Sequence, residues 1–174
     1  MNFILIQIIG FIAFATLMIS YYLKSKKSIL FLHIIAYTFF SIHYYLLAGI
    51  TGAICNVIGL LALLSIYIIE KYQWKNKSFI AGLFIIILFI INILTFQNVF
   101  SIFPLIASIV VILSFMSDSE DFIRAIGVIS AVCWLIYAIV YKSYISIIFE
   151  IITLVGTLIA FAKNTKNPNI NTIK

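Results

Sequence analysis

The chain has 174 residues, of which 65% are hydrophobic and only 9% charged, and its formal net charge is +6. A soluble domain is about half apolar and about a quarter charged, so this composition excludes an ordinary soluble protein and leaves no length for a soluble catalytic domain. Segments of roughly 17–25 apolar residues, enough to cross a ~30 Å hydrocarbon core, fill nearly the whole chain. We therefore expect an all-α, polytopic membrane protein with a single domain.

Short polar or turn-forming loops divide the chain into seven predicted transmembrane helices. The first lacks the basic start and the small-residue cleavage site of a signal peptide, so we expect it to remain in the protein. The seven spans are residues 3–23, 29–48, 50–69, 79–95, 99–116, 122–141 and 144–162. The membrane domain then covers residues 1–163, and the polar residues 164–174 predict a disordered cytoplasmic tail.

The basic residues predict the orientation of the seven spans. If the spans alternate in direction, ten of the eleven Lys and Arg residues fall on one side of the membrane and only Lys142 falls on the other. Cytoplasmic loops carry the excess of positive charge, so we expect the N-terminus outside and the C-terminus in the cytoplasm, in the inner membrane of a bacterium. The net charge is then explained by topology and by attraction to anionic lipid, and it gives no reason to expect nucleic-acid binding.

An internal repeat appears when the chain is shifted against itself by 94 residues. The shift aligns the first three spans (residues 3–70) with the last three (residues 99–163) without a gap, and the loops stay in register. The linker span at 79–95 lies between them and returns the second repeat to the direction of the first. Such a 3+1+3 arrangement of parallel repeats is one plan of transporters, in which substrates bind near the midplane where the repeats meet.

Glu150 is the most unusual residue of the chain, because every other acidic residue lies in a loop or at a membrane edge. Ser146, Glu150, Thr153 and Thr157 recur at helical spacing and therefore share one face. Burial favours the neutral form of a carboxyl group, so Glu150 could exchange a proton, or it could accept hydrogen bonds from a hydroxylated or cationic solute. The structural alternative is a carboxyl group that is hydrogen-bonded to Ser146 or to a neighbouring tyrosine.

The repeat places Asn56 at the position equivalent to Glu150, and His43 at the position equivalent to Tyr137. Asn56 could donate and accept hydrogen bonds with a polar solute, or it could hold two helices together. His43 could relay protons to Glu150, or it could lie at the membrane interface, and the aromatic residues could wall a pocket or belong to an interfacial belt. The candidate substrate-binding residues are Asn56, Glu150, His43, Tyr137, Trp134, Phe40 and Ser146.

Two further sets of residues concern movement. Gly10 and its repeat equivalent Pro104 weaken the first helix of each repeat, and they predict either paired hinges or static kinks. The first inner loop is basic and its equivalent is acidic, so the two loops could pair as a cytoplasmic gate, or stay solvated, since exposed ion pairs contribute only ~0–1 kcal/mol. The candidate gate residues are Lys24, Lys27, Asp118 and Asp121.

The sequence shows no metal-ligand spacing, phosphate-binding loop or catalytic triad, so we expect neither enzymatic activity nor a metal or cofactor. Cys55 and Cys133 have no C-x-x-C partner and read as small packing residues. We expect a small polar solute and membrane lipid as binding partners. The sequence leaves open whether the protein forms a homo-oligomer.

Two stretches of the chain carry a family resemblance. SKKSILFLHIIAYTFFSIHYYLLAGITGAICNVIG (residues 25–59) and WLIYAIVYKSYISIIFEIIT (residues 134–153) resemble the bacterial YgjV-type inner-membrane protein family. The 3+1+3 plan, the helix-breaking pair and the Asn56/Glu150 pair are similar to the wider SWEET, PQ-loop and MtN3-like superfamily. That resemblance implies alternating-access transport of a small polar solute, with the Asn56-type pair lining the pocket.

The chain departs from that superfamily in three ways. It has no Pro-Gln dipeptide, its first repeat has no proline, and Glu150 stands where an amide of the pocket pair is expected. An acid at this position favours a proton-linked or cation-preferring carrier over a neutral sugar facilitator. The alternative is a membrane receptor or scaffold that binds a ligand without carrying it, as in some PQ-loop-like proteins.

Overall fold

The computed structural model describes residues 2–21, 23, 25–73, 76–117 and 120–166. Within these residues the protein is all-helical, as predicted, with seven α-helices and one short 3-10 helix. The elements are α1 (Phe3–Tyr21), α2 (Lys26–Leu46), α3 (Ile50–Lys71), α4 (Lys77–Leu94), η1 (Val99–Ser101), α5 (Ile102–Ser114), α6 (Glu120–Val140) and α7 (Tyr144–Lys166).

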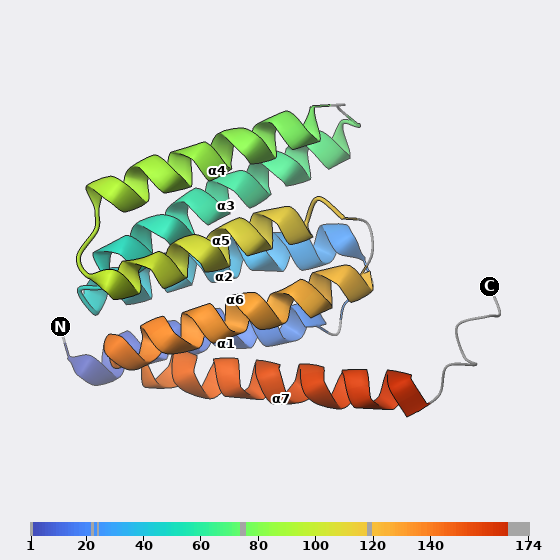
Figure 1. The fold of residues 1–174 in the computed structure, drawn as a ribbon. Coiled ribbons are helices and arrows are strands. Elements are labelled where there is room, and N and C mark those ends of the chain that lie inside the picture. Colours follow the sequence, from blue (N-terminus) through green and yellow to red (C-terminus); the bar gives the residue numbers. More distant parts are fainter. Residues whose placement is uncertain (1, 22, 24, 74–75, 118–119, 167–174) are drawn as a thin grey trace.

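The seven helices run side by side along one common direction (Figure 1). Helix α1 packs against α2 and α7, α2 packs against α3, and α5 packs against α3 and α6, while α4 lies at one edge against α3 and α5. The N-terminus and the turns after α2, α4 and α6 lie at one end of the bundle, and α7 runs out at the other (Figure 1). These ends are called the turn end and the C-terminal end below.

The helices have the composition of membrane-spanning segments. Each of α1 to α4 contains at least 18 residues that are long and apolar enough together to cross a membrane. In the described parts of the other helices the apolar stretches are shorter, at residues 99–114, 126–140 and 144–156. Large apolar side chains such as Phe79 and Leu94 stay exposed on the outside of the bundle, as expected where lipid rather than water surrounds the protein.

Each predicted span corresponds to one observed helix, although most of the helix bounds differ from the predicted ones by one to four residues. Helix α7 continues to Lys166, so residues 164–166 extend the helix, and the rest of the predicted tail lies outside the described residues. The fifth span begins as a 3-10 turn, because the side chain of Asn98 accepts a hydrogen bond from the N–H of Phe100 at 3.0 Å and holds that turn. The α-helix proper starts three residues later than predicted.

The turns after α2 and α6 have the same conformation. Ala48 and Lys142 both adopt the left-handed region, with φ of 60° and 54°. The next N–H then reaches back to a carbonyl of the preceding helix, from Gly49 to Tyr44 and from Ser143 to Ala138, at 2.9 Å in both cases. This pattern ends both helices in the way that left-handed C-terminal caps do.

Two glutamines fasten these turns to other helices. The side chain of Gln97, before α5, donates to the carbonyl of Ala48 and accepts from the second N–H of α3, at 3.2 and 3.4 Å. The side chain of Gln7, in α1, donates to the carbonyl of Lys142 and accepts from the second N–H of α7, at 3.4 and 3.3 Å. Each glutamine therefore supplies the hydrogen bonds that a turn and a helix start leave unmade.

The main core at the centre of the bundle is aromatic. Phe40 and Tyr44 from α2, Trp134 and Tyr137 from α6, and Phe149 from α7 are all buried in one cluster, together with small alanines from α1, α2, α3 and α5. These five rings are called the aromatic cluster below. Because alanines face them, the backbones of the neighbouring helices come close enough for the rings to fill the space between the helices.

Candidate functional site

His43 lies in the last turn of α2, is fully buried, and joins three helices. Its Nδ1 atom lies 2.8 Å from the carbonyl oxygen of Ile6 in α1, and its Nε2 atom lies 2.6 Å from the hydroxyl oxygen of Ser143, just before α7. A side chain at Gly10 would meet this ring, since an added Cβ would lie 2.8 Å from Cε1 of His43. Gly10 is therefore required for the close approach of α2 to α1.

A row of polar groups leads from His43 along the first turns of α7. Ser143 occupies the position where N-cap serines are found, and its hydroxyl donates to the hydroxyl oxygen of Ser146 at 2.6 Å. The hydroxyl of Tyr44 lies near Ser143 and Ser146, and the carboxyl group of Glu150 is within its electrostatic range. Glu150 follows Ser146 by one helical turn, as the spacing predicts. All five side chains are buried inside an otherwise apolar bundle.

Glu150 has no hydrogen-bond donor of its own in the described part of the chain. Its side chain is only 7% exposed. No described residue donates to its carboxyl group or forms an ion pair with it, and the hydroxyl of Tyr44 lies within electrostatic range of it. The predicted alternative of a carboxyl held by Ser146 is therefore not observed. A buried carboxyl without donors is costly, and ionisable groups at membrane depth commonly mark pathways for protons or solutes.

The candidate aromatic residues pack tightly against each other and against α3. Trp134 stacks on Tyr44 with ring centroids 5.3 Å apart, and Phe40 lies 6.4 Å from Phe149. The hydroxyl oxygen of Tyr137 accepts a hydrogen bond from the N–H of Gly52 at 2.9 Å. The structure brings together six of the seven predicted binding residues in this way, around His43 at one side and the aromatic cluster at the other.

Asn56 is the predicted binding residue that stays apart from the others. Its side-chain amide donates to the carbonyl of Gly52, one turn earlier in α3, at 2.9 Å. In the described residues no hydrogen bond joins Asn56 to Glu150. The two residues that the predicted repeat makes equivalent are therefore not hydrogen-bonded to each other, although both side chains are buried.

The structure places the predicted hinge residue Pro104 and only part of the predicted gate. Pro104 is the third residue of α5, in the first turn, where a helix tolerates proline, so it lies at the start of this helix rather than inside it. Lys27 is exposed. Lys24 and Asp118 lie outside the described residues, as does the side chain of Asp121, so the gate and the hinge stay predictions.

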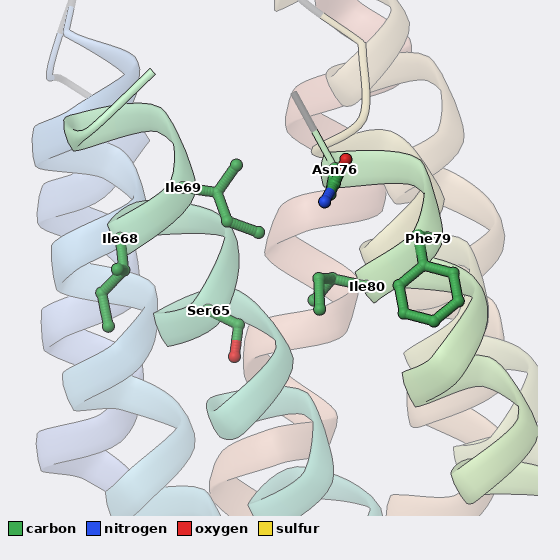
Figure 2. Close-up of a pocket in the computed structure, with 6 residues that line it drawn as sticks. All are labelled: Ser65, Ile68, Ile69, Asn76, Phe79 and Ile80. Carbon is green, nitrogen blue, oxygen red and sulfur yellow. The ribbon is translucent and has the colours of Figure 1, made fainter. Parts of the chain in front are cut away.

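A separate pocket of about 390 Å³, which no sequence pattern predicted, lies between α3 and α4 at the C-terminal end. Figure 2 shows its lining, which consists of Ser65, Ile68 and Ile69 on α3, Asn76 just before α4, and Phe79 and Ile80 on α4. The hydroxyl of Ser65 donates to the carbonyl of Leu61 in its own helix at 2.8 Å. The lining is therefore mostly apolar, and none of the predicted binding residues contributes to it.

Ser143 and Tyr44 belong to the polar row, but they were not among the predicted binding residues. Ser143 reads as part of a short loop, and Tyr44 as one of several interfacial aromatics. The N-cap position of Ser143, three residues before Ser146, was the available signal, because an N-cap serine turns its hydroxyl into the first turn of the helix. Nothing local in the sequence indicates that His43 reaches the same hydroxyl.

The comparison with protein families gives one match. The family model Imp-YgjV, described as bacterial inner membrane protein, matches residues 4–167. No curated protein and no solved structure matches the chain.

Proposed function

The chain belongs to the Imp-YgjV family of bacterial inner membrane proteins, and we propose that it carries a small polar solute across that membrane by alternating access. The observation that carries this proposal is Glu150, a buried carboxyl to which no described residue donates a hydrogen bond. Such a group inside lipid-embedded helices lowers the stability of the folded protein. It is explained if a solute or a proton supplies the missing partner during part of a working cycle.

The two-repeat organisation supports the proposal. Helix α6 begins and ends 94 residues after α2, and α7 begins 94 residues after α3. The left-handed residues Ala48 and Lys142 are also 94 apart. The packing is related as well, since α1 contacts α7 while α5 contacts α3. These relations are those of two three-helix units around a pseudo-twofold axis, with α4 as the linker, and rocking of one unit against the other would expose a central site to each side in turn.

The ends of the bundle agree with the proposed orientation. Lys142 lies at the turn end, whereas Lys71 and Lys77 lie at the C-terminal end. With the excess of basic residues facing the cytoplasm, the turn end, where His43 lies, faces outward. The aromatic cluster packs residues of α2, α6 and α7 together, so its rings must move apart before a solute can pass between these helices.

A binding test separates Glu150 from the other acids of the chain. We expect one class in a panel of amino acids, amines, sugars and nucleosides to raise the melting temperature of the purified wild-type protein. Glu150→Gln keeps the shape but removes the charge, and the loss of one charge-assisted hydrogen bond, about 1.5–3 kcal/mol, weakens binding roughly tenfold or more. The measurement is a thermal-shift titration.

Glu70→Gln is the matched control for this test. Glu70 forms an ion pair with Lys77, with Oε1 and Nζ 2.7 Å apart, at the C-terminal end of α3. The same substitution there removes a charge from the interface without touching the proposed site, so the solute should still shift the melting temperature. An equal shift of the melting temperature in Glu150→Gln and wild type would show that Glu150 does not bind the solute.

A receptor or scaffold that binds a ligand without carrying it is the second candidate. The close packing of the aromatic cluster favours it, because Trp134, Tyr44 and Tyr137 must part before a solute can pass. The two candidates make the same prediction for binding but not for flux. Binding without uptake into liposomes would identify the receptor.

A further inference from the structure

The pocket between α3 and α4 lies on the outer surface of the bundle. Its lining includes two exposed side chains, Ile68 at 37% and Phe79 at 72%, beside the buried Ile69 (Figure 2). Helix α4 itself lies at one edge of the bundle (Figure 1). The volume of about 390 Å³ falls within the range of small-molecule sites, which is roughly 300–1,000 Å³. The pocket is therefore large enough for a ligand that reaches it from the bilayer.

The lining of the pocket suits a hydrocarbon chain better than a polar solute. Four of its six residues are isoleucine or phenylalanine. The hydroxyl of Ser65 already donates to the carbonyl of Leu61 in its own helix, at 2.8 Å. A polar solute would give up its hydrogen bonds to water in such surroundings without replacing them. A hydrocarbon chain has no hydrogen bonds to lose.

The pocket extends from the ends of the two helices toward the interior of the membrane. Helix α3 ends at Lys71 and α4 begins at Lys77, so both helices meet the membrane surface here. Ser65 lies six residues before Lys71 in α3, a distance of about 9 Å along the helix axis. An occupant can therefore place its polar end at the surface and its apolar end beside Ser65.

The turn between the two helices supplies positive charge at this surface. Residues 70–77 contain three lysines and a single acidic residue, Glu70. Glu70 pairs with Lys77, with Oε1 and Nζ 2.7 Å apart. Lys71 is exposed and forms no ion pair with a described acidic residue, and its Nζ lies 5.6 Å from the ring centroid of Tyr72. The mouth of the pocket therefore carries a lysine charge that attracts an anion.

We propose that the pocket binds one anionic phospholipid, with an acyl chain between α3 and α4 and the phosphate beside Lys71 and Asn76. Asn76 stands just before α4 and forms no capping hydrogen bond through its side chain, so its amide is free to donate to a phosphate oxygen. This inference goes beyond the proposed function, because neither transport nor Glu150 enters it.

The headgroup determines the selectivity of such a site. Lipid tails are as apolar as the lining, so the acyl chain gains packing contacts in the pocket rather than a hydrophobic driving force. Lipids with the same chains therefore fill the pocket equally well, whatever their headgroup. The attraction between Lys71 and the phosphate favours a lipid with net negative charge over a zwitterionic one.

A second copy of the chain fits this pocket less well than a lipid does. Two parallel copies that met at this face in a symmetric dimer would bring the same turn of each copy together. Each turn carries three lysines and one acid, and like charges placed against each other oppose association. An anionic lipid instead brings the charge that the turn lacks.

A lipid titration of the detergent-solubilised protein tests the headgroup contact. A ligand that binds only the folded state raises the melting temperature. We expect phosphatidylglycerol to raise that of the wild type at lower concentration than phosphatidylcholine with the same chains, and inorganic phosphate to have no effect. Lys71→Gln should weaken the response to phosphatidylglycerol roughly fivefold. Lys142→Gln is the control, because Lys142 is also exposed but lies at the turn end.

A substitution that fills the pocket tests the position of the acyl chain. Ser65→Leu places an apolar side chain in the pocket, so we expect the response to phosphatidylglycerol to be lost while the protein stays folded without lipid. Thr38→Leu is the control, because the hydroxyl of Thr38 likewise donates within its own helix, to the carbonyl of Ile34 at 3.0 Å, and does not line the pocket. Ile80→Phe fills the same pocket from α4 and replaces Ser65→Leu if that variant does not fold.

Three results would overturn the proposal. They are equal responses to the two lipids, equal responses of Lys71→Gln and Lys142→Gln to phosphatidylglycerol, and a full response of the filled variant. A dimer that light scattering detects for the wild type but not for Ser65→Leu would assign the pocket to a second copy, and it would overturn the proposal too. No solute is present in these titrations, so their failure leaves the solute-binding test unaffected, and the reverse also holds.

Discussion

Gly52→Ala lowers the melting temperature of the protein, and we expect it to be among the most destabilising small substitutions in the chain. A Cβ atom at Gly52 would overlap Cε1 of Tyr137 and lie 2.9 Å from Cζ of the same ring. The ring cannot move away easily, because Tyr141 lies 4.5 Å and Tyr44 5.4 Å from it between ring centroids. Overpacking of this kind costs about 1–3 kcal/mol.

The hydrogen bond from the N–H of Gly52 to the hydroxyl of Tyr137 adds to the effect. If the ring shifts to admit the new methyl group, this 2.9 Å bond between α3 and α6 is lost, and an unsatisfied buried partner costs about a further 1–3 kcal/mol. Thermal unfolding in detergent measures the change. We expect the double substitution Gly52→Ala with Tyr137→Leu to be less destabilised than the sum of the two single changes.

Gly82→Ala and Gly156→Ala are the matched controls for this substitution. An added Cβ at either position meets nothing within 4 Å. Alanine is a better helix former than glycine by up to about 1 kcal/mol, so both controls should be neutral or slightly stabilised. Equal stability of Gly52→Ala and the two controls would show that α3 and α6 do not approach as closely as described here.

Glu150→Leu raises the melting temperature of the protein, although it removes the group on which the proposed function depends. In the described residues the carboxyl has no hydrogen-bond donor, so its burial is not offset by bonds within the folded state. A leucine of similar length removes the free-energy cost of burying a polar group without a hydrogen bond. This cost is about 1–3 kcal/mol for one such group in proteins. Replacing buried ionic groups by apolar ones is often stabilising for the same reason.

The direction of this change separates a functional from a structural role of Glu150. A carboxyl that holds the helices together would make Glu150→Leu unstable, whereas a carboxyl kept for its chemistry costs stability. Glu70→Leu is the control, because Glu70 has an ion-pair partner in Lys77. Both side chains of that pair are only partly buried, so the control should lose less than about 1 kcal/mol. Destabilisation by Glu150→Leu would contradict the account.

The sequence predicts the fold better than it predicts the site. The helices depend on local patterns, whereas the site depends on contacts between residues that lie far apart in the sequence. Helix positions follow from local apolar runs and turns, which is why the bounds of α2 and α6 are close to the predicted ones. The common face of Ser146 and Glu150 follows from helical spacing in the same way. The hydrogen bond between His43 and Ser143 joins residues 100 positions apart, and no local pattern specifies it.

The predicted repeat makes Asn56 and Glu150 equivalent, but no hydrogen bond joins their side chains in the described residues. An offset of 94 identifies equivalent positions, and equivalent positions need not be neighbours in space. Helix α3 packs against α5 and α7 packs against α1, which in each case is the first helix of the other predicted repeat. Residues such as His43 and Ser143, which are not equivalent to each other, are the ones that meet between the units.

Uptake into liposomes tests the central claim most directly. Wild-type protein, Glu150→Gln and Glu70→Gln are reconstituted separately, and the initial rate of uptake is measured for radiolabelled solutes of the class that shifts the melting temperature. We predict uptake by wild type and by Glu70→Gln, and a rate lower by roughly tenfold or more for Glu150→Gln, from the loss of one charge-assisted hydrogen bond. Uptake by Glu150→Gln at the wild-type rate would contradict the role of Glu150, and no uptake by the wild type of a solute that it binds would contradict transport.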